Sequence, residues 1–175
     1  MSLYLVETTV EKNGVTKEDL KAKINRVEEK LGDSAFIEVQ IAKDLSQLFF
    51  IIETDHLENI AKVFEDHQLA VQLTKEVRLI GEDIEDVKKE KEKVNYVVEW
   101  NLPEHLTMEQ YLERKKKNSV HYEEVPEVSF ARTYVCEDMT KCLCFYDAPN
   151  QQAVERARDA VSAPIDAITE LGDDE

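Results

Sequence analysis

Three cysteines lie close together in the last third of the chain, at Cys136, Cys142 and Cys144. Thiolates are good ligands for zinc and copper(I), so this spacing could build a soft-metal site. No fourth ligand follows at a recognisable spacing, and reduced cysteine is among the residue types most often buried. The sequence therefore favours core thiols, and a soft-metal site at these cysteines is the alternative.

Histidine is the other side chain that would join such a metal site. The chain has four histidines, and His121, in "VHYEEV", is the one near both acidic residues and the start of a predicted strand. A surface histidine is the simpler interpretation. His121 is therefore kept with the three cysteines only as part of the alternative metal set.

The predicted elements that carry these residues belong to a segment that occurs twice in the chain. "LYLVETTV" near residue 3 returns as "NYVVEWNL" near residue 95, and "DLSQLFFIIETD" from Asp44 returns as "DMTKCLCFYDAP" from Asp138 without a gap. The stretch between the copies, "EDIEDVKKEKEK", is charged and has little to bury. We predict a first copy over residues 1–81, a charged linker over 82–93 and a second copy over 94–175.

Each copy alternates between strand and helix periodicity. In the first, strands are predicted at 3–10, 35–42 and 48–53, with helices after Thr16 and Asp55 and a short last strand. The order β-α-β-β-α-β is that of the ferredoxin-like unit. Both faces of the third strand are apolar, so helices cover one and another sheet must cover the other. The predicted class is α+β, an intramolecular pseudo-dimer with its sheets face to face or closed as an α/β barrel.

Strand alternation predicts which side chains lie on the face away from the helices. A hairpin centred near Met139 would set Cys136 opposite Cys142 and place Leu143 on the helix side. Glu7 and Glu99 of the first strands then lie between the sheets, where carboxylates need partners or water. The face collects Arg132, Tyr134, Cys136, Cys142, Cys144 and Tyr146.

This face predicts a polar cavity with a ligand-binding set. Glu7 and Glu99 are the anionic anchors and Arg132 is the cationic one, while Tyr134 and Tyr146 form hydrogen-bonding walls. The structural alternative leaves both glutamates in solvent at strand ends and pairs Glu38 with Arg132, an arrangement without chemistry.

Charge and composition exclude several functions. Lys plus Arg number 22 and Asp plus Glu number 38, so the net charge of −16 disfavours nucleic acid and anionic membrane as partners. No apolar run approaches the ~20 residues of a membrane span, and no signal-peptide pattern is visible. An odd number of cysteines fits reduced thiols. A cytoplasmic protein is predicted.

Phosphate-binding glycine loops and nucleophile elbows are absent from the sequence, and "KCLCFYDA" lacks the glycine of RNA-recognition strands.

The segment "YVCEDMTKCLCFYDAPNQQAVERARDAVSAPIDAITEL" resembles a small ferredoxin-like family of largely unknown function, some members of which are described as nickel-binding proteins. The resemblance covers about residues 95–171 and includes "YVVE", "KCLCFYDAP" and "APIDAITEL". It implies the ferredoxin-like fold and a divalent metal such as nickel as cofactor. The family often has a histidine where this chain has Arg132, and a guanidinium has no lone pair to offer a metal.

Three functions remain after these exclusions. The first is a small-ligand or metal-ion binding protein, without catalysis, that uses the predicted cavity. The second is an α/β-barrel enzyme of the cofactor-independent oxygenase or isomerase type, in which Arg132 and a carboxylate position an anionic substrate. The third is an interaction module without chemistry. A small molecule or metal ion is the expected partner, and a homo-oligomer is compatible with the sequence.

Overall fold

The computed structural model describes residues 2–10, 16–80, 84–89 and 94–172. The chain divides into two compact units, Met1–Val77 and Arg78–Glu175, and each is described by itself. No helix of the described residues is long and apolar enough to cross a membrane.

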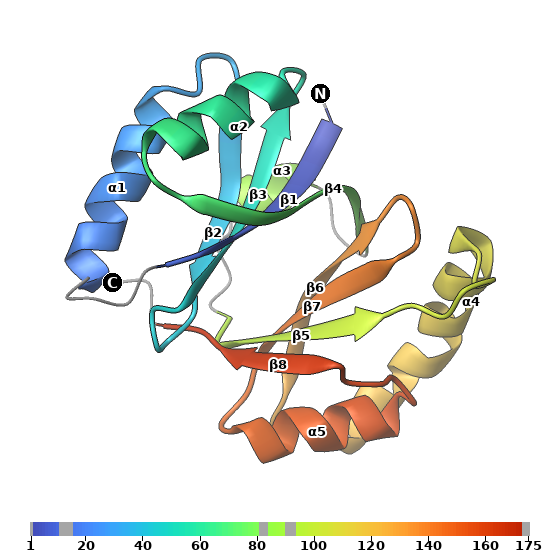
Figure 1. Ribbon diagram of the computed structural model, residues 1–175. Helices are drawn as coiled ribbons and strands as arrows, with labels where there is room; N and C mark the ends of the chain where they lie inside the picture. Colours follow the sequence, from blue (N-terminus) through green and yellow to red (C-terminus); the bar gives the residue numbers. More distant parts are fainter. Residues whose placement is uncertain (1, 11–15, 81–83, 90–93, 173–175) are drawn as a thin grey trace. The chain divides into compact units, whose positions relative to one another are not determined.

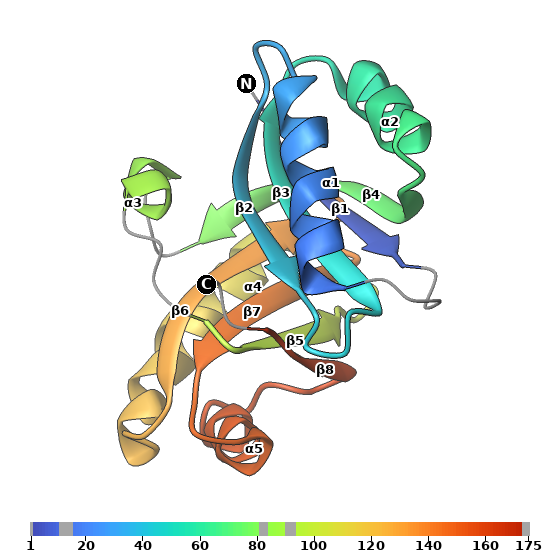
Figure 2. The ribbon, with the colours of Figure 1, turned by 90° about the vertical axis from the view of Figure 1, so that its left-hand side faces the viewer.

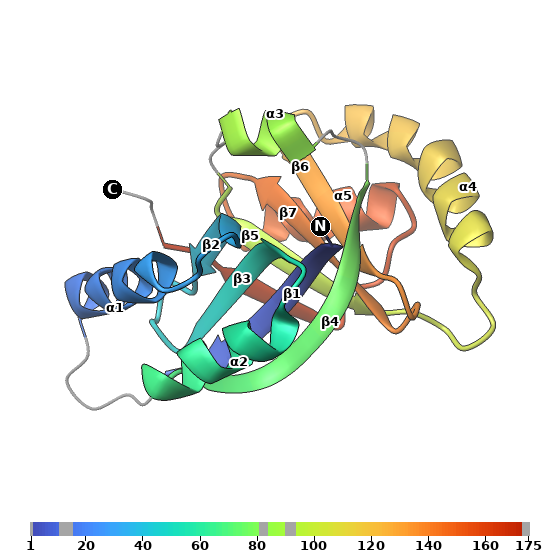
Figure 3. The same cartoon turned by 90° about the horizontal axis from the view of Figure 1, so that it is seen from above.

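The first unit contains β1 (Ser2–Thr9), α1 (Lys17–Glu29), β2 (Ala35–Ile41), β3 (Gln47–Thr54), α2 (Leu57–Asp66) and β4 (Ala70–Ile80), whose last residues pass into the second unit. Its strands are antiparallel in the order β2-β3-β1-β4. Both helices lie on one face of this sheet (Figures 2 and 3). The core between them is apolar, and Leu20, Phe50 and Phe64 are buried in it.

The second unit contains α3 (Ile84–Lys89), β5 (Tyr96–Asn101), α4 (Met108–Asn118), the 3-10 helix η1 (Ser119–Glu124), β6 (Ser129–Cys136), β7 (Lys141–Asp147), α5 (Gln151–Ala160) and β8 (Ala167–Glu170). Its strand order is β6-β7-β5-β8, again antiparallel. Figure 1 shows α5 along the sheet and α4 beyond the end of β5. The predicted α+β class with ferredoxin-like units is confirmed, and the packing of the two sheets on each other stays a prediction.

The predicted charged linker, 82–93, contains α3, where Val87 is buried. Residues 82, 83 and 90–93 lie outside the described part of the chain, as does the predicted strand end at Gly81.

Local sequence explains why the same elements form twice. Thr16 and Asp19 form a capping box at the start of α1, and Thr107 and Gln110 form another at the start of α4. In each such box a hydroxyl and an N3 side chain satisfy two backbone N–H groups that the helix leaves unpaired. Both helices are therefore fixed at their first residue.

The β2–β3 and β6–β7 hairpins have the same type of turn. Asp44 accepts hydrogen bonds from the backbone N–H and hydroxyl of Ser46, and Asp138 does the same for Thr140. The residue after each aspartate has a left-handed φ, 64° at Leu45 and 59° at Met139. In each tight turn the aspartate side chain thus accepts a hydrogen bond from a backbone N–H that has no strand partner there.

Register and bulge also agree between the two hairpins. Phe36 pairs with Ile52 and Val39 with Phe50, and a spacing of 94 residues maps these pairs onto Phe130 with Tyr146 and Thr133 with Cys144. A bulge interrupts both ladders just after Phe36 and Phe130. The spacing of 94 also maps α2 onto α5. Residues 35–66 and 129–160 can therefore be compared position by position.

The predicted register of the β6–β7 hairpin is wrong by one residue. Val135, not Cys136, lies opposite Cys142, and Tyr134 lies opposite Leu143. The left-handed φ of Met139 allows a connection of residues 137–140, and a one-residue slip moves every side chain of a strand to the other face. The predicted faces of β7 are consequently exchanged.

Candidate functional site

Several polar side chains lie in the otherwise apolar layer between the sheet and the helices of the second unit. Strand β7 turns Cys142, Cys144 and Tyr146 toward the helices, where they pack with Ala153 and Ala157 of α5. The remaining members of this layer are Tyr111 and Lys115 of α4, Tyr122 of η1, Thr133 of β6 and Arg158 of α5. We call these residues the polar layer.

Arg158 is the charged residue at the centre of this layer, and it is only 2% exposed. Its Nη1 donates to the hydroxyl of Tyr146 at 3.0 Å, and its Nη2 donates to the carbonyl of Pro164 at 2.5 Å. Its Nε is buried and has no hydrogen-bond partner in the described part of the chain. Neither hydrogen bond goes to a carboxylate, although a buried guanidinium keeps its charge and needs a compensating anion.

Tyr146 links Arg158 to η1. Its hydroxyl lies 2.7 Å from the hydroxyl of Tyr122, whose ring stacks on Phe130 with centroids 5.3 Å apart. Burial raises the pKa of both phenols, so both stay neutral. The Tyr146 hydroxyl can therefore accept from the guanidinium and cannot neutralise it.

Cys144 is the group that can supply the anion. The Cys142 thiol donates a hydrogen bond to it, and this bond lowers the pKa of Cys144 well below its ordinary value, together with the charges of Arg158 and Lys115. The hydroxyl of Thr133 adds a hydrogen bond at 3.3 Å and itself accepts from Lys115 at 2.9 Å. Burial opposes the shift. These donors favour the thiolate at Cys144.

Cys144 in turn changes the pKa values of Arg158 and Cys142. Burial alone would lower the pKa of Arg158, but the negative charge at Cys144 raises it above its ordinary value. The pKa of Cys142 is raised well above its ordinary value, first because its thiol proton is held by Cys144 and then because the thiol is buried. The two thiols and the guanidinium thus form one interacting buried group in which Cys144 is the thiol whose ionised form is favoured.

A small pocket opens onto this group. Its volume is about 30 Å³, which gives room for about two water molecules. Three cations line it, and its lining contains no carboxylate. The lining residues are Trp100, Tyr111, Arg114, Lys115, Asn118, Ser119, Tyr122, Cys144, Arg158, Val161 and Ala163. The lining is therefore cationic in a chain whose net charge is −16.

The first unit fills the corresponding layer with apolar side chains. Phe50 and Phe64 occupy the places of Cys144 and Arg158, and their rings contact edge-on with centroids 4.8 Å apart. With the helices aligned at their capping boxes, the members of the apolar layer are Leu20, Ile24, Val39, Leu48, Phe50, Ile52 and Phe64, in place of Tyr111, Lys115, Thr133, Cys142, Cys144, Tyr146 and Arg158. The same fold thus forms without any of these polar groups.

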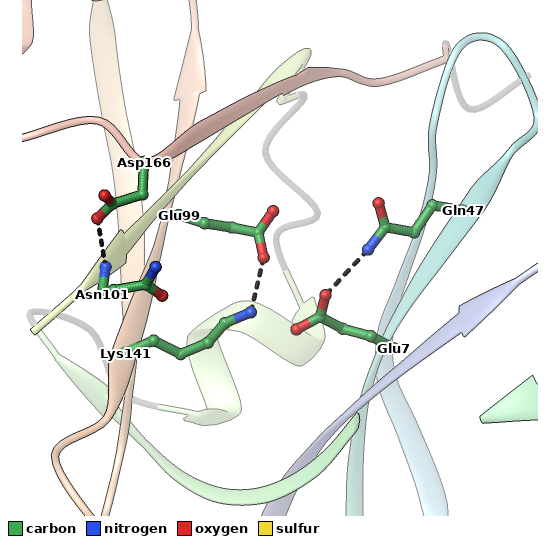
Figure 4. Close-up of polar contacts among 6 residues, drawn as sticks. All are labelled: Glu7, Gln47, Glu99, Asn101, Lys141 and Asp166. Carbon is green, nitrogen blue, oxygen red and sulfur yellow. Dashed lines mark hydrogen bonds and ion pairs between the residues drawn. The ribbon is translucent and has the colours of Figure 1, made fainter. Parts of the chain in front are cut away.

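The residues of the predicted ligand set lie in several places. Glu7 accepts from Gln47 at 2.9 Å in the first unit, and Glu99 pairs with Lys141 at 2.6 Å in the second (Figure 4). Asp166 accepts from the backbone N–H of Asn101, two residues beyond Glu99 (Figure 4). Lys141 is the first residue of β7 and pairs with Asn101 in the β5–β7 ladder, two residues from Glu99, which places its ammonium group beside the Glu99 carboxylate.

Arg132 and Tyr134 lie on the face of β6 that points away from the helices. The guanidinium of Arg132 lies 5.6 Å from the ring of Phe145, and the ring of Tyr134 meets Phe145 edge-on. Tyr146 was predicted on this face and lies on the helix side instead, because of the register slip. The part played by these residues in binding stays a prediction.

The residues of the predicted metal set also lie in separate places. All three cysteines are free and buried, as predicted for core thiols, but Cys136 lies on the face opposite Cys142 and Cys144. His121 is exposed and contacts Glu124 at 2.7 Å. The described residues contain no group of three or more histidine, cysteine, aspartate or glutamate side chains placed to hold a metal ion. The donor set does not fit a divalent cation, since Arg158 and Lys115 already carry positive charge beside Cys144.

The sequence contained a signal for Arg158 that the strand pattern did not reveal. Position-by-position comparison of the two copies sets Arg158 against Phe64 and Cys144 against Phe50, and both positions are inward in the first copy. Charge at a position that is apolar in the other copy indicates a functional group. Tyr122 has no counterpart in the first unit, which lacks η1.

Residues 96–171 match the family described as nickel responsive protein SCO4226-like. No protein with a curated description matches the chain. A solved structure provisionally named chlorite dismutase TA0507 has a TM-score of 0.63 and 10% identity, covering 99% of this chain and 96% of that one. A mutant chlorite dismutase from Candidatus Nitrospira defluvii has a TM-score of 0.54 and 10% identity, covering 99% and 93%.

A protein from Fusobacterium nucleatum subsp. nucleatum, provisionally named a monooxygenase, has a TM-score of 0.51 and 14% identity, covering 97% and 90%. These likenesses show that the fold extends over both units. The second unit matches the nickel responsive SCO4226-like family, in a chain that has the fold of chlorite dismutase and monooxygenase structures.

Proposed function

We propose that the protein binds a small anion in the cationic pocket of the second unit, with Arg158 as its anchor. The observation that carries this proposal is the buried guanidinium whose Nε has no hydrogen-bond partner in the described part of the chain. A buried donor left without a partner is costly, so a ligand that accepts from it gains the energy of a charge-assisted hydrogen bond.

The pocket limits the ligand to a few atoms. Sites for drug-sized molecules enclose ~300–1,000 Å³, whereas this pocket has about 30 Å³. With a thiolate at Cys144, the cations Arg114, Lys115 and Arg158 still leave the lining with excess positive charge. A monatomic or small oxygen-containing anion fits both the size and the charge.

Stability does not explain the polar layer. Buried ion pairs are often neutral or unfavourable compared with well-packed apolar residues, and the first unit shows that apolar residues satisfy this fold. Groups that cost stability are retained where they bind or react. An enzyme with a cysteine nucleophile would use this same site, since a thiolate beside a guanidinium can act as a nucleophile, whereas the predicted oxygenase or isomerase uses Arg132 and a carboxylate. Three free thiols fit the reducing cytoplasm.

Trp100 provides a direct test, because it is the one tryptophan of the chain and lines the pocket. Iodide is a small anion that quenches indole fluorescence on contact. We expect saturable quenching of Trp100 by iodide in the native protein, and Arg158→Met, which removes the charge at similar length, should weaken it about tenfold or more.

Arg156→Met is the matched control, since Arg156 lies on the same helix and pairs with Glu127 at the surface. This variant should bind iodide as the native protein does. Non-saturable quenching that is equal in all three proteins would contradict the proposal.

A further inference from the structure

We infer that Cys144 is a peroxide-reactive thiol and that the substrate class of this pocket includes small hydroperoxides. The inference rests on the proposed function, because the peroxide must enter the same pocket. It depends on four features of the site: a cysteine that lines the pocket, donors that hold it, a cation for the leaving oxygen, and a cavity of matching size.

Cys144 lines the pocket although the residue is only 2% exposed. The Thr133 hydroxyl donates a hydrogen bond to the Cys144 sulfur at 3.3 Å, and the neighbouring Cys142 thiol lowers the pKa of Cys144. A thiolate fixed by donors is the nucleophilic form of cysteine.

Arg158 supplies positive charge for the oxygen atom that leaves when the O–O bond breaks. The oxygen that leaves a hydroperoxide becomes negative, and the positive charge of Arg158, which lines the cavity, stabilises that oxygen. The Nε of Arg158 is buried and has no hydrogen-bond partner in the described residues. The cavity of about 30 Å³ has room for the two oxygen atoms of hydrogen peroxide.

The side chains of the site and the peroxide itself supply every atom and electron of the step. The Cys144 thiolate attacks the terminal oxygen, an S–O bond forms and the O–O bond breaks. The sulfur loses two electrons and becomes a sulfenic acid, while the peroxide is reduced to an alkoxide or hydroxide. That anion takes the proton of the Cys142 thiol and leaves as an alcohol or water.

The product should remain a sulfenic acid rather than an internal disulfide. Cys142 and Cys144 are two residues apart on β7 and point the same way. Residues at this spacing lie about 6.6 Å apart at Cα with parallel Cβ vectors, and a disulfide needs its Cβ atoms about 3.8 Å apart. An external thiol is therefore required to return Cys144 to the reduced form.

Hydrogen peroxide followed by dimedone, with peptide mass mapping, tests the inference on the full chain. We expect the dimedone adduct at Cys144, formed faster than on free cysteine, and its loss in Cys144→Ser. Arg158→Met should slow adduct formation roughly tenfold or more. Cys136→Ser is the matched control, because Cys136 is a buried thiol of the same unit on the opposite face, and it should leave the rate unchanged.

The results separate this inference from the proposed function. Iodide binding without an adduct at Cys144 would overturn peroxide reactivity and leave the anion site standing. An adduct at Cys144 without iodide binding would support the inference and overturn Arg158 as an anion anchor. Equal labelling of Cys136 and Cys144 would overturn the inference, since it would show general unfolding. Circular dichroism of each variant confirms that the comparison is made on folded protein.

Discussion

Arg158 and Tyr146 are joined by a direct hydrogen bond in the polar layer. Nη1 of Arg158 donates to the Tyr146 hydroxyl at 3.0 Å, and that hydroxyl also meets Tyr122 at 2.7 Å. In a buried site, a donor that loses its acceptor bears the full cost of its desolvation. The hydroxyl of Tyr146 is thus the atom that connects the buried charge to η1.

Tyr146→Phe should lower the free energy of unfolding by ~1–3 kcal/mol, because it leaves Nη1 of Arg158 without an acceptor while the ring still fills the core. Tyr122→Phe is the matched control: it removes a hydroxyl from the same hydrogen bond but leaves the acceptor of Arg158 in place. Urea denaturation of both variants and of the double variant measures the coupling. Equal and additive losses below ~0.5 kcal/mol would show that the Tyr146 hydroxyl does not hold Arg158.

At the scale of elements, hairpin β6–β7 decides which residues meet. The order of the elements in each unit and the start of α1 after Thr16 follow from periodicity and capping, so the sequence predicts them. The face of β7 depends on one left-handed residue, Met139, that periodicity does not reveal. A misjudged turn therefore placed Cys144 and Tyr146 on the wrong face, although the identity of both as site candidates was predicted.

The exchange of Phe64 and Arg158 between the units makes an asymmetric prediction for helices α2 and α5. Phe64→Arg should lower the free energy of unfolding by more than ~3 kcal/mol, because the charge would be buried against Phe36 and Phe50 with no anion near it. Arg158→Met should cost less than ~1 kcal/mol or raise stability, because the Cys144 thiol can take up a proton once the cation is gone.

Thermal or urea unfolding of the two single variants measures this asymmetry. Losses of similar size would mean that Arg158 serves the fold of the second unit and that its binding role needs another explanation.

At the scale of the whole molecule, the net charge of −16 opposes the cationic lining of the pocket. At low ionic strength the Debye length of ~30 Å lets an approaching anion experience the whole chain, and at 0.15 M it falls to ~8 Å. The distant negative charges are then screened more than the nearby cations of the pocket.

We therefore expect iodide quenching of Trp100, at a fixed iodide concentration, to increase by a few-fold between ~0.01 M and ~0.15 M of a salt with a bulky anion. Acrylamide, a neutral quencher, should show no such dependence. A decrease with salt would mean that the local cations control the approach of the anion.

The apolar layer of the first unit has a consequence for chemical durability. Every cysteine, the one tryptophan and the methionines Met108 and Met139 belong to the second unit, so between Ser2 and Val77 the sequence contains no sulfur atom. Oxidants act on thiols, thioethers and indole far more readily than on Phe50, Phe64 and their aliphatic neighbours. In the first unit Met1 is thus the one residue that contains sulfur, and every thiol that a thiol reductant would have to repair lies in the second unit.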